Sequence, residues 1–142
     1  MANSFQCEIV SAEQSIFSGE ISQLVAAGTM GDLGIMAGHA PLLTELKPGP
    51  LRVLGEDGDE QIYYVDGGFL EVQPNLVSVL ADSAVRARDL DEAEAEAARK
   101  EAKHELDEQK SDLDYSRAAA ELAEAVAKLR TLDQLRRKSG SR

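Results

Sequence analysis

The residues best suited to chemistry are few and scattered. The chain has two histidines, His39 and His104, and one cysteine, Cys7. They belong to no spaced metal-ligand motif, so the sequence predicts no metal site. A triad of His39, Asp32 and a serine is conceivable, but no nucleophile-elbow sequence supports it. Cys7 is more simply interpreted as a buried strand thiol, because free cysteine is among the most buried residue types.

A glycine-rich stretch over residues 28–34 is the candidate phosphate loop. It lacks the Gly-Lys-Ser/Thr ending of a P-loop and the glycine spacing of a dinucleotide fingerprint. It opens no predicted helix, whose N-terminus would hold a phosphate. The sequence therefore predicts no catalytic residue and no cofactor, and the chain is expected not to be an enzyme on its own.

Composition excludes several classes of protein. The 142 residues carry a formal net charge of −11, which argues against binding nucleic acid or docking directly on an anionic membrane. No apolar stretch approaches the ~18 residues of a membrane span. The first residues lack the basic and apolar regions of a secretory signal. We therefore expect a cytoplasmic protein that can reach a membrane through a partner.

The sequence pattern changes from strand-like to helix-like near residues 86–89. Before this point Phe5, Cys7 and Ile9 alternate with polar residues, the period of a half-buried strand. Asp57-Gly58 predicts a hairpin turn, whereas Gly67-Gly68 is expected to break the chain. Short strands about 8–12 residues apart are typical of a sandwich or barrel. Residues 1–86 are therefore predicted to form an all-β sandwich domain.

Residues 87–142 are predicted to form an all-α domain. Asp89 is expected to cap an alanine-rich helix that continues to about Lys110, and Ser111 begins a break before a second helix over about 115–136. Two helices joined by a short break form an antiparallel hairpin. Apolar residues at three- and four-residue steps predict one buried stripe on the second helix: Leu122, Val126, Leu129, Leu132 and Leu135.

The contacts that hold this hairpin are predicted to be weak. Its first helix offers mostly alanine methyl groups, each worth about 0.8 kcal/mol when buried. Alanine also has the highest helix propensity, so each helix can persist without the other. This combination suits a conformational switch, but it equally suits two helices that approach closely through small residues.

Two surface features leave alternatives open. The C-terminal end is basic, with Arg130, Arg136, Arg137 and Lys138, although the chain as a whole is acidic. This basic tip predicts an acidic docking surface on a partner, or is a solvated helix end. The apolar residues of 34–43 form either an interface patch or a loop packed over the chain's own core.

Ordered motifs over almost the whole chain resemble the epsilon-subunit family of the bacterial F-type ATP synthase. The most specific are residues 31–35 (GDLGI) and 38–43 (GHAPLL). Residues 10–13 (VSAE), followed by 17–19 (FSG), resemble the family's first strands. Residues 66–72 (DGGFLEV) and 79–82 (VLAD) resemble its later strands.

This resemblance implies a non-catalytic subunit of the central stalk in a proton-translocating ATP synthase. The sandwich would bind the gamma subunit and rest on the membrane ring of c subunits, with Asp32 and His39 facing that ring. The hairpin would fold on the sandwich or extend beside gamma. Extended, it would bring Arg130, Arg136, Arg137 and Lys138 to an acidic loop of a catalytic beta (or alpha) subunit and inhibit ATP hydrolysis. The chain would lie peripherally on the cytoplasmic face of the bacterial inner membrane.

One departure from the family concerns ATP. Some members bind ATP in the folded hairpin through a first-helix motif, Leu/Ile-Asp-x-x-Arg-Ala. Residues 90–95 here read LDEAEA, with Glu94 in the place of the arginine. Exchanging a guanidinium for a carboxylate beside a triphosphate replaces attraction by repulsion. We therefore expect weak ATP binding or none.

Two other functions remain as alternatives at this point. The chain could be a stand-alone adaptor whose sandwich and hairpin bind soluble partners. It could also be a small hydrolase that uses His39 and Asp32.

Overall fold

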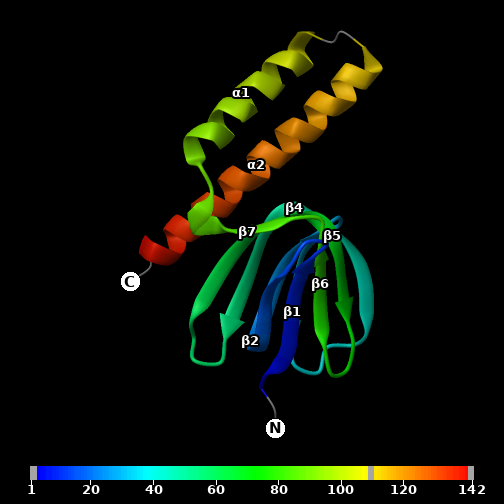
Figure 1. Ribbon diagram of the computed structural model, residues 1–142, viewed down its shortest axis with the longest axis vertical. Coiled ribbons are helices and arrows are strands. Elements are labelled where there is room, and N and C mark those ends of the chain that lie inside the picture. The colour runs from blue at the N-terminus through cyan, green and yellow to red at the C-terminus, as the bar shows by residue number, and fades with distance from the viewer. Residues whose placement is uncertain (1–2, 109–110, 141–142) are drawn as a thin grey trace.

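Seven strands precede two helices in the computed structural model, which describes residues 3–108 and 111–140 (Figure 1). The strands are β1 (Phe5–Ser11), β2 (Ser15–Gly28), β3 (Gly31–Met36), β4 (Leu42–Gly55), β5 (Glu60–Val72), β6 (Val77–Ala81) and β7 (Ala84–Arg86). A 3-10 turn, η1 (Ala87–Asp89), leads into α1 (Glu92–Glu108) and α2 (Asp112–Gly140). The predicted fold class, a β-sandwich followed by a helical hairpin, is confirmed.

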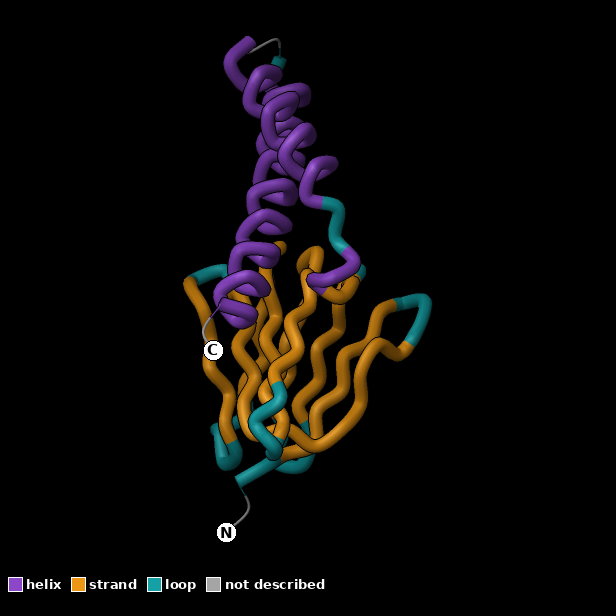
Figure 2. The backbone as a smooth tube through the Cα atoms, turned by 90° about the vertical axis from the view of Figure 1, so that its left-hand side faces the viewer, coloured by secondary structure: helices purple, strands orange, loops and turns teal. Residues whose placement is uncertain are grey.

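The strands form one sheet that closes on itself. Its order is β1-β6-β5-β4-β2-β3, and β1 also pairs with β2 while β7 pairs with β5. The β1–β6 pair is parallel and every other pair is antiparallel. The hairpin lies at the end of the sandwich opposite the N-terminus (Figure 2).

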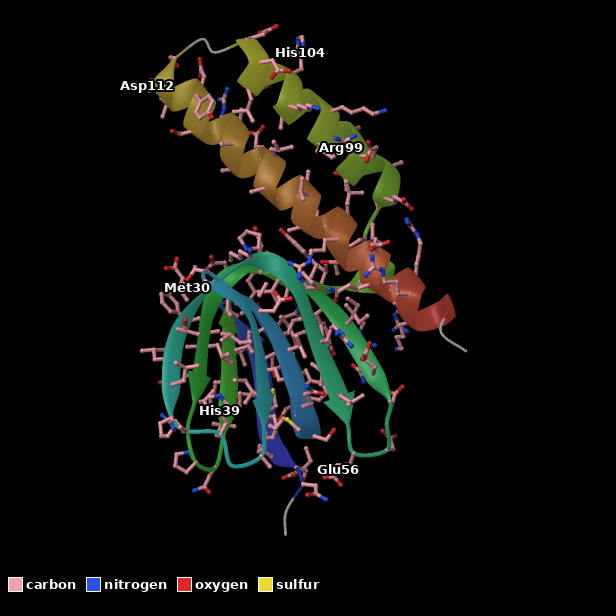
Figure 3. All side chains as sticks on the ribbon, turned by 180° about the vertical axis from the view of Figure 1, so that it is seen from behind. Met30, His39, Glu56, Arg99, His104 and Asp112 are labelled. Atoms are coloured by element: carbon pink, nitrogen blue, oxygen red, sulfur yellow. The ribbon has the colours of Figure 1, made fainter. Side chains whose placement is uncertain are left out.

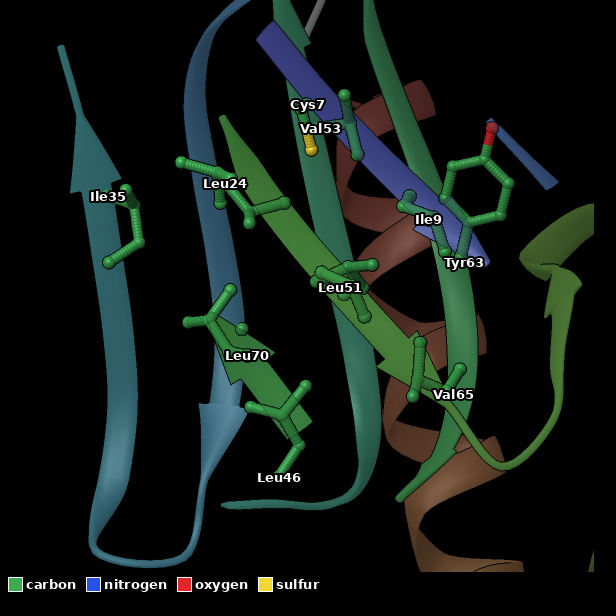
Figure 4. Packing of buried hydrophobic residues seen from close by; sticks show 14 of the residues in the cluster. Cys7, Ile9, Leu24, Ile35, Leu46, Leu51, Val53, Tyr63, Val65 and Leu70 are labelled. Atoms are coloured by element: carbon green, nitrogen blue, oxygen red, sulfur yellow. The ribbon is translucent and has the colours of Figure 1, made fainter. Parts of the chain in front are cut away.

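Alternating side chains of these strands fill the interior (Figure 4). Ile9, Leu24, Leu51 and Leu70 are almost fully buried. Cys7 is buried among them, as predicted, and burial raises the pKa of its thiol to about 12. A neutral, inaccessible thiol packs as a small apolar side chain.

The prediction that Gly67-Gly68 ends a strand is wrong. Strand β5 continues through both glycines, which have φ of +84° and +132°. A Cβ on Gly68 would lie 2.1 Å from the carbonyl oxygen of Leu80 on β6. The glycines therefore let β5 bend while its neighbour stays close. The Asp57-Gly58 turn is confirmed, with Gly58 at φ +86° and Asp57 Oδ1 accepting a 2.9 Å hydrogen bond from the Asp59 amide.

The stretch from residue 28 to residue 43 is more regular than its glycines and proline suggest. Strand β3 occupies part of the glycine-rich stretch over residues 28–34, and Leu42 and Leu43 begin β4. Ile35 is buried in the core, whereas Met36 and Leu43 are exposed. Some apolar residues of 34–43 thus pack into the core from a strand, whereas others are left exposed on the sandwich.

Both helices begin at side-chain caps. Asp91 Oδ1 accepts a 3.0 Å hydrogen bond from the Glu94 amide, so Asp91 caps α1, and Asp89 lies in η1. Ser111 Oγ accepts a 3.1 Å bond from the Asp114 amide at the start of α2. The second helix is longer than predicted at both ends. The predicted end of the first, Lys110, lies outside the described residues.

Small residues hold the two helices together. Ala95 and Ala102 of α1 and Ala118 and Ala125 of α2 are buried. Val126, which the predicted apolar stripe included, is about half exposed, because the buried face of α2 runs through alanines, Thr131 and Leu132. The hairpin thus buries little side-chain volume in each contact.

Candidate functional site

The docking interface between α2 and the sandwich contains three of the residues that the sequence singled out, Asp32, Arg130 and Lys138. Helix α2 packs against β4, β5 and η1, whereas α1 packs mainly on α2. Leu135 of α2 lines a small cavity of about 100 Å³ together with Ile62 and Tyr63 of β5. The buried Thr131 donates a 2.7 Å hydrogen bond to the Ala127 carbonyl, so its hydroxyl is satisfied within the helix.

An ion pair joins the two parts of the molecule at Arg130. Its Nη2 donates to Asp32 Oδ2 at 2.8 Å, across 98 positions of the sequence. Asp32 stands near the start of β3, at the end of the sandwich that faces the helices. Both side chains keep more than two fifths of their surface exposed, so the pair contributes little stability of its own.

The rest of the predicted basic tip is also engaged within the chain. Arg136 pairs with Glu92 in the first turn of α1, and the Lys138 ammonium donates to the carbonyl oxygen of Glu60 at the start of β5. Arg137 lies 3.0 Å from Asp133 on its own helix. Three of the four predicted residues, including Arg130, thus bridge α2 to another element.

His39 lies far from this interface. It follows β3 in the turn before β4, and its Nδ1 is 2.7 Å from the Ala40 carbonyl oxygen. Asp32 is near the other end of β3, and Figure 3 shows His39 at the end of the sandwich away from Met30. The part of β3 from Asp32 to Met36 alone spans ~13 Å at 3.3 Å per residue. Asp32 and His39 cannot act together on one substrate, which removes the hydrolase alternative.

A partly buried polar network, absent from the sequence predictions, lies where α2 crosses β5. The Tyr64 hydroxyl donates to Asp66 Oδ1 at 3.1 Å. On α2, Lys128 Nζ lies 3.0 Å from Glu124 Oε1 and 5.6 Å from the centroid of the Tyr64 ring. Burial, the nearby Glu124 and Asp82 raise the pKa of Asp66 against the opposing effects of Tyr64 and Lys128. Burial and Asp66 raise the pKa of Tyr64 too, so its hydroxyl keeps its proton.

A cavity of about 420 Å³ opens between α1, α2 and this end of the sandwich. Its charged lining comprises seven carboxylates and one ammonium: Asp66, Asp89, Asp91, Glu94, Glu101, Glu121, Glu124 and Lys128. Glu94, at the expected arginine position of the ATP motif, is part of this lining. Such a surface repels a triphosphate.

Metal and membrane sites find no support in the described part of the chain. Residues 3–108 and 111–140 contain no group of three or more His, Cys, Asp or Glu side chains placed to hold a metal ion. Neither described helix has an apolar stretch that could cross a bilayer.

Comparison with known families decides the chain's relationships. Residues 4–87 match the beta-sandwich domain of the ATP synthase delta/epsilon chain, and residues 88–133 match the long alpha-helix domain of that chain. The chain belongs to the ATP synthase delta/epsilon family. Members of this family are subunits of ATP synthase, so the chain is a subunit and not an enzyme on its own. The free-standing adaptor alternative is thereby disfavoured.

Individual relatives agree with this membership. The ATP synthase epsilon chain of Chromohalobacter salexigens is 69% identical over 139 residues, which cover 98% of this chain and 99% of the relative. A chain of the Euglena gracilis mitochondrial ATP synthase structure superposes with a TM-score of 0.83 at 20% identity, covering 89% of this chain and 80% of that one. A chain of the central stalk and c-ring structure of the Tetrahymena thermophila mitochondrial ATP synthase superposes with a TM-score of 0.61 at 12% identity. The match covers 90% of this chain and 96% of that one. At identities this low, the two superpositions show that this chain has the same fold as those two chains.

Of the interface residues that sequence reasoning missed, only Asp66 could have been suspected from the sequence. Asp66 directly follows a run of four buried residues in β5, Ile62 to Val65. A carboxylate there is unusual unless something pairs with it. Glu124 and Lys128 resemble any solvent-facing i,i+4 pair, so only the fold reveals that they meet Asp66.

Proposed function

We propose that this chain is a non-catalytic central-stalk subunit of a proton-translocating F-type ATP synthase. Its sandwich binds the gamma subunit and the c-ring and helps transmit rotation to the catalytic head. Its hairpin restrains ATP hydrolysis when it leaves the sandwich and extends toward the beta and alpha subunits. The chain lies peripherally on the cytoplasmic face of the bacterial inner membrane. Membership of the delta/epsilon family and the 69% identical epsilon chain support this role.

The observation that carries the regulatory part is the light attachment of the hairpin. Of the two helices as described, only α2 packs on the strands of the sandwich, and it is joined to them by surface ion pairs such as Arg130–Asp32. An exposed ion pair contributes only about 0.2–1 kcal/mol. A partner that binds the released hairpin ~10⁴-fold better than the docked one would shift the population almost completely. A lightly docked hairpin is within reach of such a partner.

The same cations serve in both states of this proposal. Arg130 and Lys138 contact Asp32 and the Glu60 carbonyl while the hairpin is docked. They reach an acidic surface of the catalytic head only after those contacts break. Docking on the sandwich and binding to the head are therefore mutually exclusive, as a two-state brake requires.

An exposed apolar face on the sandwich supports a protein partner there. Phe69 of β5 pairs in register with Leu80 of β6, and Leu43 of β4 lies diagonally across from Phe69. All three point outward, and their side chains are 46–66% exposed. Adjacent exposed apolar side chains on a strand surface favour a partner. We assign this Leu43–Phe69–Leu80 face to the gamma subunit.

Membrane vesicles carrying the ATP synthase test both parts of the proposal. Replacing the chain by one that lacks residues 88–142 should leave assembly and proton coupling intact and raise ATP hydrolysis severalfold. Phe69→Ser with Leu80→Ser should instead release the chain from the complex. Leu113→Ser, which alters an exposed apolar residue of the hairpin, should leave assembly unchanged. Unchanged hydrolysis after the truncation would remove the inhibitory role, and retention of the double variant would remove the gamma assignment.

A further inference from the structure

The network where α2 crosses β5 contains more negative charge than its one cation offsets. Asp66 lies on β5 beside Tyr64, and Glu124 and Lys128 face them from α2. Lys128 is shared, because it pairs with Glu124 and also lies over the Tyr64 ring. With both carboxylates ionised, the group carries a net charge of −1 at an interface where Asp66, Glu124 and Lys128 are each only partly buried. One added proton brings it to neutrality.

We propose that Asp66 is a proton-operated latch for the hairpin: the docked hairpin favours the protonated form of Asp66, and loss of that proton loosens α2 from the sandwich. The proton removes the repulsion between Asp66 and Glu124 without disturbing the Lys128–Glu124 pair. Tyr64 remains a hydrogen-bond donor to Asp66 in either state. The latch belongs to the chain itself and does not depend on its partners.

Carboxylates on the neighbouring elements further disfavour the ionised form of Asp66. Asp82, in the turn between β6 and β7, acts on Asp66 in the same direction as Glu124. The cavity beside the network adds the carboxylates of Asp89, Asp91, Glu94, Glu101 and Glu121. Among the described residues that line this cavity, Lys128 is the sole cation.

The direction of the pH effect follows from proton linkage. Burial and the facing carboxylates raise the pKa of Asp66 in the docked state, whereas in the released hairpin it returns toward the ordinary value of about 4. The docked state therefore binds more protons. Docking is strongest at low pH and weakens as pH rises through the raised pKa, by up to about tenfold per pH unit within that window. Below about pH 4 the latch contribution is fully present.

The two histidines lie elsewhere and do not share this network. His39 is at the far end of β3, and His104 lies 2.9 Å from Glu108 on α1, away from the sandwich. Substituting Asp66 therefore isolates the latch from histidine titration. Asn is the matched replacement, because its side-chain oxygen still accepts the Tyr64 hydrogen bond while the charge is removed.

Energy transfer between dyes on Met30→Cys and Leu113→Cys measures docking in the full chain. Both positions are highly exposed, and the buried Cys7 does not compete for label. The docked fraction of the parent should fall severalfold as pH rises from 4 to 8. Asp66→Asn should stay docked across the range with no pH response, and Glu124→Gln should show a much smaller one. Asp107→Asn, an equal charge change on the exposed face of α1, should follow the parent.

A parent with no pH response, or an Asp66→Asn variant that keeps the parent's response, would overturn the latch. Glu124→Gln keeps the test decisive if Asp66→Asn fails to fold, because it removes the same repulsion from a surface helix. A parent-like pH response in Glu124→Gln would also overturn it.

Discussion

At the scale of single residues, the docked hairpin is held by side chains that can readily change partner. Arg130 and Asp32 are both partly exposed and meet through one 2.8 Å contact. Lys138 and Arg136 add similar contacts at the end of α2. Because each contact is exchangeable with water, none alone decides whether the hairpin docks.

The Arg130–Asp32 pair gives the first prediction. Arg130→Gln should lower the docking equilibrium constant by about 1.4- to 5-fold, the range expected for an exposed ion pair. Asp32→Asn should have the same effect, and the double variant should be no worse than either single variant. High salt should reduce the difference. The dye-pair measurement at constant pH checks this. Arg117→Gln is the control, because Arg117 pairs with Asp114 at 3.6 Å within the hairpin and not with the sandwich. Strictly additive effects would show that the two do not interact.

ATP binding gives a second prediction at this scale. The isolated chain should bind ATP no more tightly than about 100 µM, a binding free energy of about −5.5 kcal/mol. The reason is the carboxylate-lined cavity, with Glu94 where the motif has arginine. Glu94→Arg should bind ATP more tightly than the native chain, whereas Asp107→Arg adds equal charge outside the cavity and should not. Calorimetry measures all three, and tight binding by the native chain would contradict the prediction.

At the scale of elements, period and turn chemistry predicted most strands but not their lengths. The alternation of Phe5, Cys7 and Ile9 and the Asp57-Gly58 turn were sufficient for β1 and the β4–β5 hairpin. Gly67 and Gly68 led to the wrong prediction of a strand end, because the chain uses their positive φ to bend a continuous strand. The sequence contains no direct sign of a bend, since the close approach of Leu80 comes from the β5–β6 pairing.

That bend gives the third prediction. Gly68→Ala should destabilise the sandwich by about 2–4 kcal/mol, because the new Cβ meets the Leu80 carbonyl oxygen and φ is +132°. Gly34→Ala is the matched control in β3. Its added Cβ would have no neighbour closer than 3.9 Å, so the substitution should leave stability unchanged or raise it by up to about 1 kcal/mol. Denaturant unfolding with unchanged m-values measures both, and equal midpoints would contradict the assignment of the bend.

At the scale of the whole molecule, two kinds of packing share one chain. The sandwich encloses branched aliphatic side chains in a closed sheet, and the hairpin relies on alanine contacts and on the docking of one half of α2. Sequence reasoning reached this contrast because composition changes abruptly near residue 86. It could not place α2 on β4 and β5, since the contacts between them join residues far apart in the sequence.

This contrast predicts unequal protection in hydrogen exchange. Amides of α1 and of α2 should exchange through local opening well before those of Ile9 and Val79, whose exchange requires unfolding of the closed sheet. Deleting residues 88–142 should shift the unfolding midpoint of the sandwich only slightly, because the buried core cluster is built from residues of the strands alone and includes none from α1 or α2. If the helix amides prove as protected as those of Val79, the hairpin is part of one cooperative unit. A hairpin bound that firmly could not act as a brake.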